Sequence, residues 1–175
     1  MGNKIPRIDL DRLGDEKALA MAAYGRSVAA YRYIVLAEKS RGELRETFEH
    51  LAADERVRRD RLQKLLLEKS PDGGFCLSNT DKQAVCVGPR LVDARDDARI
   101  DEAMKLVIGS AKRTASFYAR YAGVARDPIV RRTFEDMAVE ALTQVRRLRE
   151  VFHMAGRQIV EPCPVQQISV GSRAP

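Results

Sequence analysis

The residues best suited to chemistry in this sequence are a carboxylate and a guanidinium that lie where a helix should be apolar. Glu55 and Arg58 fall among Phe48, Leu51 and Leu62, at steps of three, four and seven residues that share one helical face. A carboxylate in a core can bind a metal cation or pair with a cation of the chain. A guanidinium stays charged at every relevant pH and binds no metal. The function therefore depends on what these polar core positions hold.

The same helical face occurs a second time in the chain, and there it is less charged. The first copy consists of Phe48, Leu51, Ala52, Glu55, Arg58 and Leu62, and its counterparts are Phe134, Met137, Ala138, Ala141, Gln144 and Leu148. The polar pair of the first copy is thus replaced by Ala141 and Gln144. Each copy predicts a helix whose repeated face packs into a core.

Four helices are needed to position these residues. Caps, glycines and hydrophobic spacing predict helices at about 15–40, 43–69, 97–125 and 128–154, with Asp15 as a cap of the first and Asp127 before Pro128 as the start of the last. The first and third helices match at an offset of 85 residues, which pairs Arg26 with Ala111. The second and fourth match at an offset of 86. We expect two duplicated hairpins, so the predicted fold is an all-α four-helix bundle.

The chain divides into four parts in this interpretation. Residues 1–14 form a lead-in, and residues 15–155 form the bundle with hairpins at 15–69 and 98–155. A crossover at 70–97 is long enough to run along the bundle between the second and third helices. Residues 156–175 form an extended C-terminal tail.

This arrangement resembles the ferritin-like superfamily and, within it, the rubrerythrin-type domains. The resemblance rests on two hairpins joined by a long crossover, and on the repeated face that the second helix of each hairpin carries. The resemblance implies a dinuclear iron site, held by a Glu from each first helix and a Glu-x-x-His from each second helix. In this sequence those positions are Arg26, Ala111, Glu55 with Arg58, and Ala141 with Gln144. Of the six implied ligands, the sequence keeps only Glu55.

One carboxylate cannot neutralise two ferrous ions, and arginine cannot bind them. We therefore expect Arg26 and Arg58 to approach Glu55 in place of the metals, with Gln144 filling the remaining donors of a buried polar cluster. We therefore expect no cofactor, and iron is the alternative cofactor if the site still binds metal. That alternative is a divergent ferroxidase or peroxidase that uses Glu55 with help from Glu140, Glu49 or His50.

Composition limits the other classes of function. The net charge of +6 comes from 31 basic and 25 acidic residues that are interspersed, and no basic run alternates with aromatic residues as nucleic-acid binding would favour. Nucleic-acid binding is a third and lower alternative. Three cysteines without paired spacing predict neither a disulfide framework nor a zinc site. The sequence has no apolar leader or membrane span, so we expect a cytoplasmic protein.

The tail carries the segment Ile168-Ser169-Val170-Gly171-Ser172. It resembles the C-terminal cargo-loading peptide of encapsulin systems, although Arg173 stands where that peptide has leucine. The resemblance implies binding in an extended form, with the two aliphatic side chains in pockets of the shell. A frayed terminus, or packing on a neighbouring subunit, is the alternative interpretation of the same residues.

The leading hypothesis for function is a rubrerythrin-like protein that has lost most ligands of the iron site. It would act without catalysis, in a structural or partner-binding role in an iron or oxidative-stress system. We expect a homo-oligomer, with an encapsulin shell as a further partner and the shell's interior as its compartment.

Overall fold

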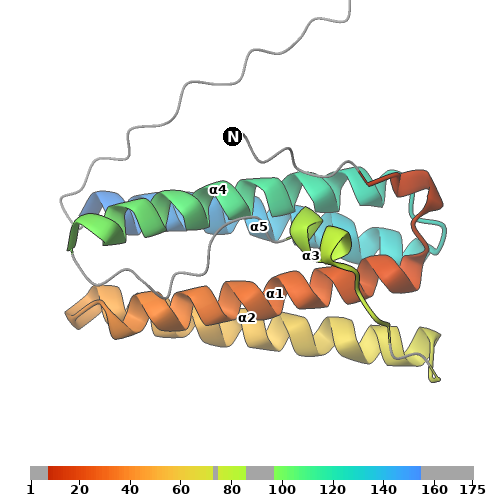
Figure 1. Cartoon of the computed structure of the whole chain (residues 1–175), viewed down its shortest axis with the longest axis horizontal. Coiled ribbons are helices and arrows are strands. Elements are labelled where there is room, and N and C mark those ends of the chain that lie inside the picture. The colour runs from red at the N-terminus through yellow and green to blue at the C-terminus, as the bar shows by residue number, and fades with distance from the viewer. Residues whose placement is uncertain (1–7, 73–74, 86–96, 155–175) are drawn as a thin grey trace, which may run out of the picture.

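The computed structural model of the chain describes residues 8–72, 75–85 and 97–154, and all its regular elements are helices. A short 3-10 helix, η1 (Leu10–Arg12), precedes α1 (Asp15–Glu38) and α2 (Gly42–Lys69). A further short helix, α3 (Asn79–Val85), comes before α4 (Asp97–Ala122) and α5 (Pro128–Met154). Figure 1 shows α1 with α2 and α4 with α5 as two hairpins packed along their length. The predicted all-α, ferritin-like bundle is confirmed.

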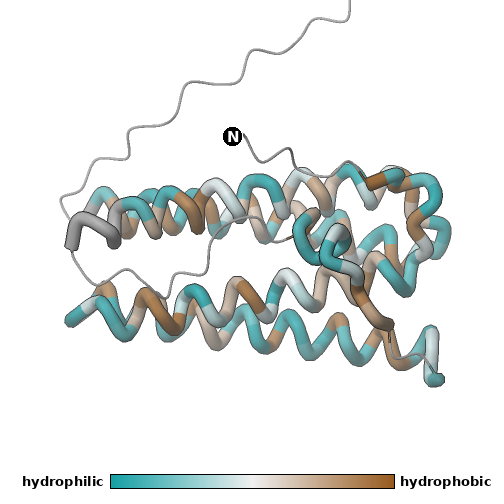
Figure 2. Tube along the Cα trace, in the orientation of Figure 1, coloured by the Kyte–Doolittle hydropathy of each residue, from teal (hydrophilic) through white to brown (hydrophobic). Residues whose placement is uncertain are grey.

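The faces predicted from the repeat are the faces that pack. In α2 the buried residues are Phe48, Leu51, Ala52, Glu55 and Leu62. In α5 every counterpart of the repeated face is buried as well. Figure 2 shows hydrophobic residues recurring along each long helix, because a helix of this kind must bury one stripe against its neighbours. α1 is buried on most sides, which its many alanines allow.

Turn residues set where the helices begin and end. Gly42 has a φ of +57°, a backbone conformation that glycine adopts without steric cost, and it starts α2 after the break that the sequence predicts. Asp127 caps α5, since its Oδ1 accepts hydrogen bonds from the backbone N–H groups of Ile129 at 2.8 Å and Val130 at 3.1 Å. α1 ends at Glu38 and α4 at Ala122, slightly before the predicted bounds.

Asp15 does not cap α1 as predicted. The N-cap position is Gly14, and Asp15 is the first helical residue. Its carboxylate instead accepts hydrogen bonds from the hydroxyl of Tyr121 at 2.6 Å and from the backbone N–H of Asp127 at 2.9 Å. Lys69, at the end of α2, forms an ion pair with Asp127. Asp15 and Asp127 thus join the ends of all four long helices.

The crossover differs from its prediction because α3 interrupts it. Residues 86–96 of the crossover, with Cys86, lie outside the described residues. So do residues 155–175, which contain Cys163 and the predicted targeting segment from Ile168 to Ser172.

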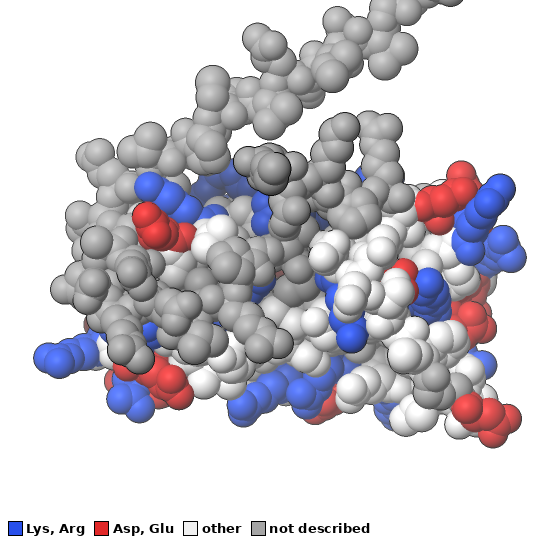
Figure 3. Space-filling model, viewed as in Figure 1, with Lys and Arg blue, Asp and Glu red and all other residues white. Residues whose placement is uncertain are grey.

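Surface charge is mixed on the face shown in Figure 3, where acidic and basic side chains alternate over its described parts. Within residues 8–72, 75–85 and 97–154, no helix combines the length and hydropathy needed to span a bilayer.

Candidate functional site

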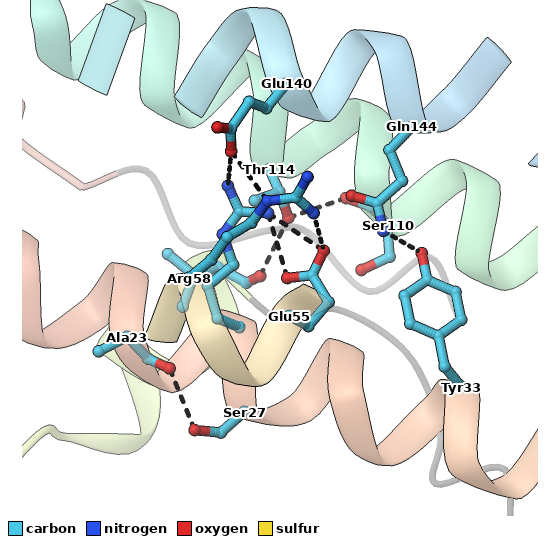
Figure 4. Close-up of polar contacts among 11 residues, drawn as sticks. Ala23, Ser27, Tyr33, Glu55, Arg58, Ser110, Thr114, Glu140 and Gln144 are labelled. Carbon is cyan, nitrogen blue, oxygen red and sulfur yellow. Dashed lines mark hydrogen bonds and ion pairs between the residues drawn. The ribbon is translucent and has the colours of Figure 1, made fainter. Parts of the chain in front are cut away.

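A cluster of four charged side chains lies between three helices, midway along the bundle. Arg26 comes from α1, Glu55 and Arg58 from α2, and Glu140 from α5. Figure 4 shows Glu55, Arg58 and Glu140 with dashed lines that converge on this point. We call these four residues the charge cluster. It occupies the level of the bundle at which the resemblance implies metal ligands.

Glu55 is the centre of the charge cluster. The Nη1 atom of Arg26 donates to both carboxylate oxygens, at 3.2 Å and 3.1 Å, and the Nη1 atom of Arg58 donates to Oε1 at 3.3 Å. Glu55 is 1% exposed and Arg26 is 3% exposed, so both charges are removed from water. The expectation that the two guanidinium groups approach Glu55 is confirmed. Charges buried in this way persist only when they are paired.

Glu140 completes the charge cluster at its rim. Its Oε2 accepts from Nε of Arg58 at 3.0 Å and lies 3.7 Å from Nη2 of Arg26. The side chain of Glu140 is 40% exposed and that of Arg58 is 25% exposed, so this side of the cluster reaches solvent. Two cations and two anions therefore balance one another across three helices.

Arg26 is the most enclosed cation of the charge cluster. Burial alone would lower its pKa, but the neighbouring Tyr118 and Glu55, with Glu140, raise it, so the guanidinium stays charged. Its carbon Cζ lies 5.2 Å from the centroid of the Tyr118 ring, a cation–π distance. Within the described part of the chain, its Nε and Nη2 atoms have no hydrogen-bond partner.

The prediction for Gln144 is wrong. Its side-chain nitrogen donates to the hydroxyl of Tyr33 at 2.8 Å instead of serving the charge cluster (Figure 4). Burial, together with the negative charge of Glu55, raises the pKa of Tyr33, so this phenol stays protonated well above neutral pH. Gln144 thus anchors α5 to α1 through a neutral hydrogen bond.

The remaining two implied ligand positions line a small cavity. Ala111 and Ala141 border an interior space of about 40 Å³, together with Arg26, Glu55 and Gln144. Roughly 10–15 Å³ of such volume holds one water molecule, so this cavity has room for a few. Alanine has no side-chain atom that can bind a metal, and its small side chain leaves part of the cavity volume unfilled.

The side chains of this region do not fit two irons. Both oxygens of Glu55 accept from guanidinium groups, and Glu140 is held by Arg58. Among the described residues, no group of three or more His, Cys, Asp or Glu side chains is placed to hold a metal ion. Glu49 pairs with Arg45 on the surface, and His50 is exposed, so neither assists Glu55.

The sequence interpretation named Glu140 only as a helper of Glu55 in the alternative metal site, and it missed Glu140 as a partner of the two arginines. In the repeat its counterpart is Asp54, an exposed residue beside the packed face, so the pattern gave no sign of its role. The length of the Arg58 side chain is what connects Glu140 to the cluster.

Comparison with known proteins agrees with the fold. Residues 17–141 match the rubrerythrin family. A hypothetical protein from Pyrococcus furiosus has a similar structure, with a TM-score of 0.70 and 18% sequence identity over 87% of this chain and 100% of that one. At this identity the likeness concerns the fold alone. No curated protein gives a significant match.

Proposed function

The chain belongs to the rubrerythrin family, and we propose that it works without the dinuclear iron chemistry that its resemblance implies. The observation that carries the proposal is the pairing of Glu55 with Arg26 and Arg58 in the bundle interior. Two fixed positive charges take the role of counter-ions for the carboxylate, so no cation is needed to stabilise it. The bundle then serves a structural or partner-binding role in an iron or oxidative-stress system.

Electrostatics support this proposal over a divergent metal enzyme. A ferrous ion at Glu55 would stand within a few ångströms of two permanent cations, and the repulsion is strong where water is excluded. To bind there, the ion would also have to displace three charge-assisted hydrogen bonds. The rival reading, with Glu55 and Glu140 as ligands of one metal, needs both arginines to move outward.

Anaerobic reconstitution with ferrous iron, followed by metal analysis of the desalted protein, tests the proposal. We expect far less than one iron per chain. About two irons per chain would overturn the proposal, and one iron that disappears in Glu55→Gln would favour the rival enzyme. A Glu49→Gln variant is the matched control, because Glu49 is an exposed carboxylate of the same helix.

We also propose that the tail delivers the chain to an encapsulin shell. The support is the sequence of Ile168-Ser169-Val170-Gly171-Ser172. Co-expression with an encapsulin shell protein and isolation of intact shells is the test. The chain should co-purify with the shell, and deletion of residues 166–175 should abolish co-purification. Ile168→Ser with Val170→Ser should weaken it, because the aliphatic side chains are the ones that would enter pockets.

A homo-oligomer remains our expectation for the assembly. Its measurement is the molar mass in solution, by light scattering of the full chain and of the form without residues 166–175. If the two forms have the same number of subunits, self-association does not depend on the tail.

A further inference from the structure

The helix α3 is built around one carboxylate. The side chain of Asp81 accepts from the backbone N–H of Ser78 at 2.9 Å, and the Ser78 hydroxyl accepts from the backbone N–H of Asp81 at 3.2 Å. This reciprocal pair is a capping box, which satisfies N–H groups that the first turn of a helix leaves free. A helix of seven residues has little else to stabilise it.

The same carboxylate fastens α3 to the bundle. Lys17 of α1 forms an ion pair with Asp81 at 3.0 Å, and the side chain of Asp81 is 8% exposed. Although burial alone would raise the pKa of Asp81, its bonds with Ser78 and Lys17 lower it, so the carboxylate is charged at neutral pH. A cation–π contact of Lys82 with Tyr24 and a 3.4 Å hydrogen bond from Thr114 to the carbonyl of Val85 add to this attachment.

α3 covers the interior cavity on the side away from Glu140. Figure 1 shows α3 across the face where α1 and α4 meet. Val85 is buried and lines the cavity with Gly25 and Thr114, while Arg58 and Glu140 lie at the partly exposed rim between α2 and α5. A Cβ atom added to Gly25 would lie 3.5 Å from the Cβ of Val85, an ordinary van der Waals distance, so Val85 packs directly against α1 at this position.

We propose that α3 is a lid on the interior cavity, that Asp81 is its latch, and that it opens as a unit while the four long helices stay folded. Only Asp81 and Val85 are buried among the residues of α3, so opening exposes little apolar surface. An open lid gives water and small hydrogen-bonding solutes access to Arg26, whose Nε and Nη2 atoms accordingly have unused hydrogen-bond donors within the described chain, although Nη2 lies 3.7 Å from Glu140. The lid does not depend on whether the interior binds metal.

Hydrogen exchange of the full chain, followed by mass spectrometry, tests the lid. Amides of α3 should exchange far faster than those of α1 around Arg26, and Asp81→Ala should speed them about tenfold, the effect of a lost cap and ion pair. The α1 amides should not change. Asp60→Ala is the matched control, because it removes an exposed ion pair from α2. Exchange of α3 and α1 at the same rate would overturn the proposal, since α3 would then open only when the whole chain unfolds.

Chemical labelling tests whether α3 closes the cavity. Thr114→Cys, in a background with the three native cysteines replaced by serine, places a thiol in the cavity wall. A small methanethiosulfonate reagent should modify this thiol at least about tenfold faster when Asp81→Ala is added. Gly25→Leu should have the same effect by displacing Val85, and Gly25→Ala should not, because a methyl fits at 3.5 Å. Faster exchange of α3 without faster labelling would refute the covering role.

Discussion

Substituting leucine for Glu55 removes the carboxylate on which three hydrogen bonds from two arginines converge. Leucine fills similar volume, so the change leaves packing nearly intact and isolates the electrostatic loss. Arg26, at 3% exposure, then keeps only a 3.7 Å approach to Glu140 as an ion pair. The variant therefore tests directly whether the interior depends on charge pairing.

The expected cost is large. Breaking a buried pair by removing one partner destabilises by about 3–5 kcal/mol, because the other charge stays uncompensated. A domain of this size is stable by roughly 5–15 kcal/mol, so the variant should lose about a fifth or more of its stability. Removing both buried charges should cost much less, since well-packed apolar residues can replace such a pair at nearly no net cost.

Urea unfolding followed by far-ultraviolet circular dichroism measures these values. Glu55→Leu and Arg26→Met should each lower the free energy of unfolding by about 3 kcal/mol or more. The double variant should lie within about 1 kcal/mol of the original chain, because Arg58 and Glu140 can still pair with each other at the rim. The control is Glu49→Leu, which breaks an exposed i,i+4 pair with Arg45 and should cost about 0.5 kcal/mol or less.

The reasoning fails if Glu55→Leu costs less than about 1 kcal/mol, the range of an exposed pair. It also fails if the two single losses simply add in the double variant, because additivity is the behaviour of residues that do not interact.

Three further predictions follow from the same contacts. Asp15→Ala should lower the free energy of unfolding by about 1–3 kcal/mol, because the buried hydroxyl of Tyr121 keeps only the Leu13 carbonyl as an acceptor and the backbone N–H of Asp127 loses its carboxylate partner. Urea unfolding of this variant, of Tyr121→Phe and of the double variant measures the coupling. Since burial raises the pKa of Tyr33, the native state holds a proton that the unfolded chain releases above about pH 10, so stability falls as pH rises through that range. Tyr33→Phe should make this fall shallower, which urea unfolding between about pH 8 and 11 would show. Finally, Arg26→Glu with Arg58→His should bind at most one divalent cation by titration calorimetry, because the second repeat supplies no ligands to the other half of the site.

Periodicity made the fold and the packed faces predictable from sequence. Phe48, Leu51 and Leu62 repeat over several turns, and such a long pattern leaves little choice of which helical face is buried. The pairing of Glu55 with both arginines was predicted from the ligand positions that the family resemblance implies, since a buried carboxylate and buried guanidinium groups at one level must satisfy each other. Both predictions require knowing only which face of its helix each side chain lies on.

The errors concern which neighbour each polar group reaches. Spacing places Gln144 in the core but does not show that the Tyr33 hydroxyl is its partner. Asp15 lies where a cap is expected, but a tertiary bond to Tyr121 uses its carboxylate. Side-chain rotamers and helix separation decide such contacts, and a sequence pattern contains neither.

α3 was missed for a different reason. Its signal is local: Ser78 and Asp81 stand three residues apart in the capping-box pattern at the start of the helix. A seven-residue helix is too short to show hydrophobic periodicity, so the crossover looked irregular. Attention to capping boxes inside long connections would have found it.

The two halves of the repeat have taken different physical roles at one level of the bundle. The first half places Arg26, Glu55 and Arg58 there, while the matching positions of the second half include two alanines. The charge cluster and the cavity consequently lie next to each other, because the arginine side chains fill the space beside Glu55 but not the space beside the two alanines. A cation bound between the halves would need ligands from both. The absence of ligand side chains at Ala111 and Ala141 and the pairing of Glu55 with two arginines therefore each oppose metal binding, and changing one half alone would leave the other obstacle in place.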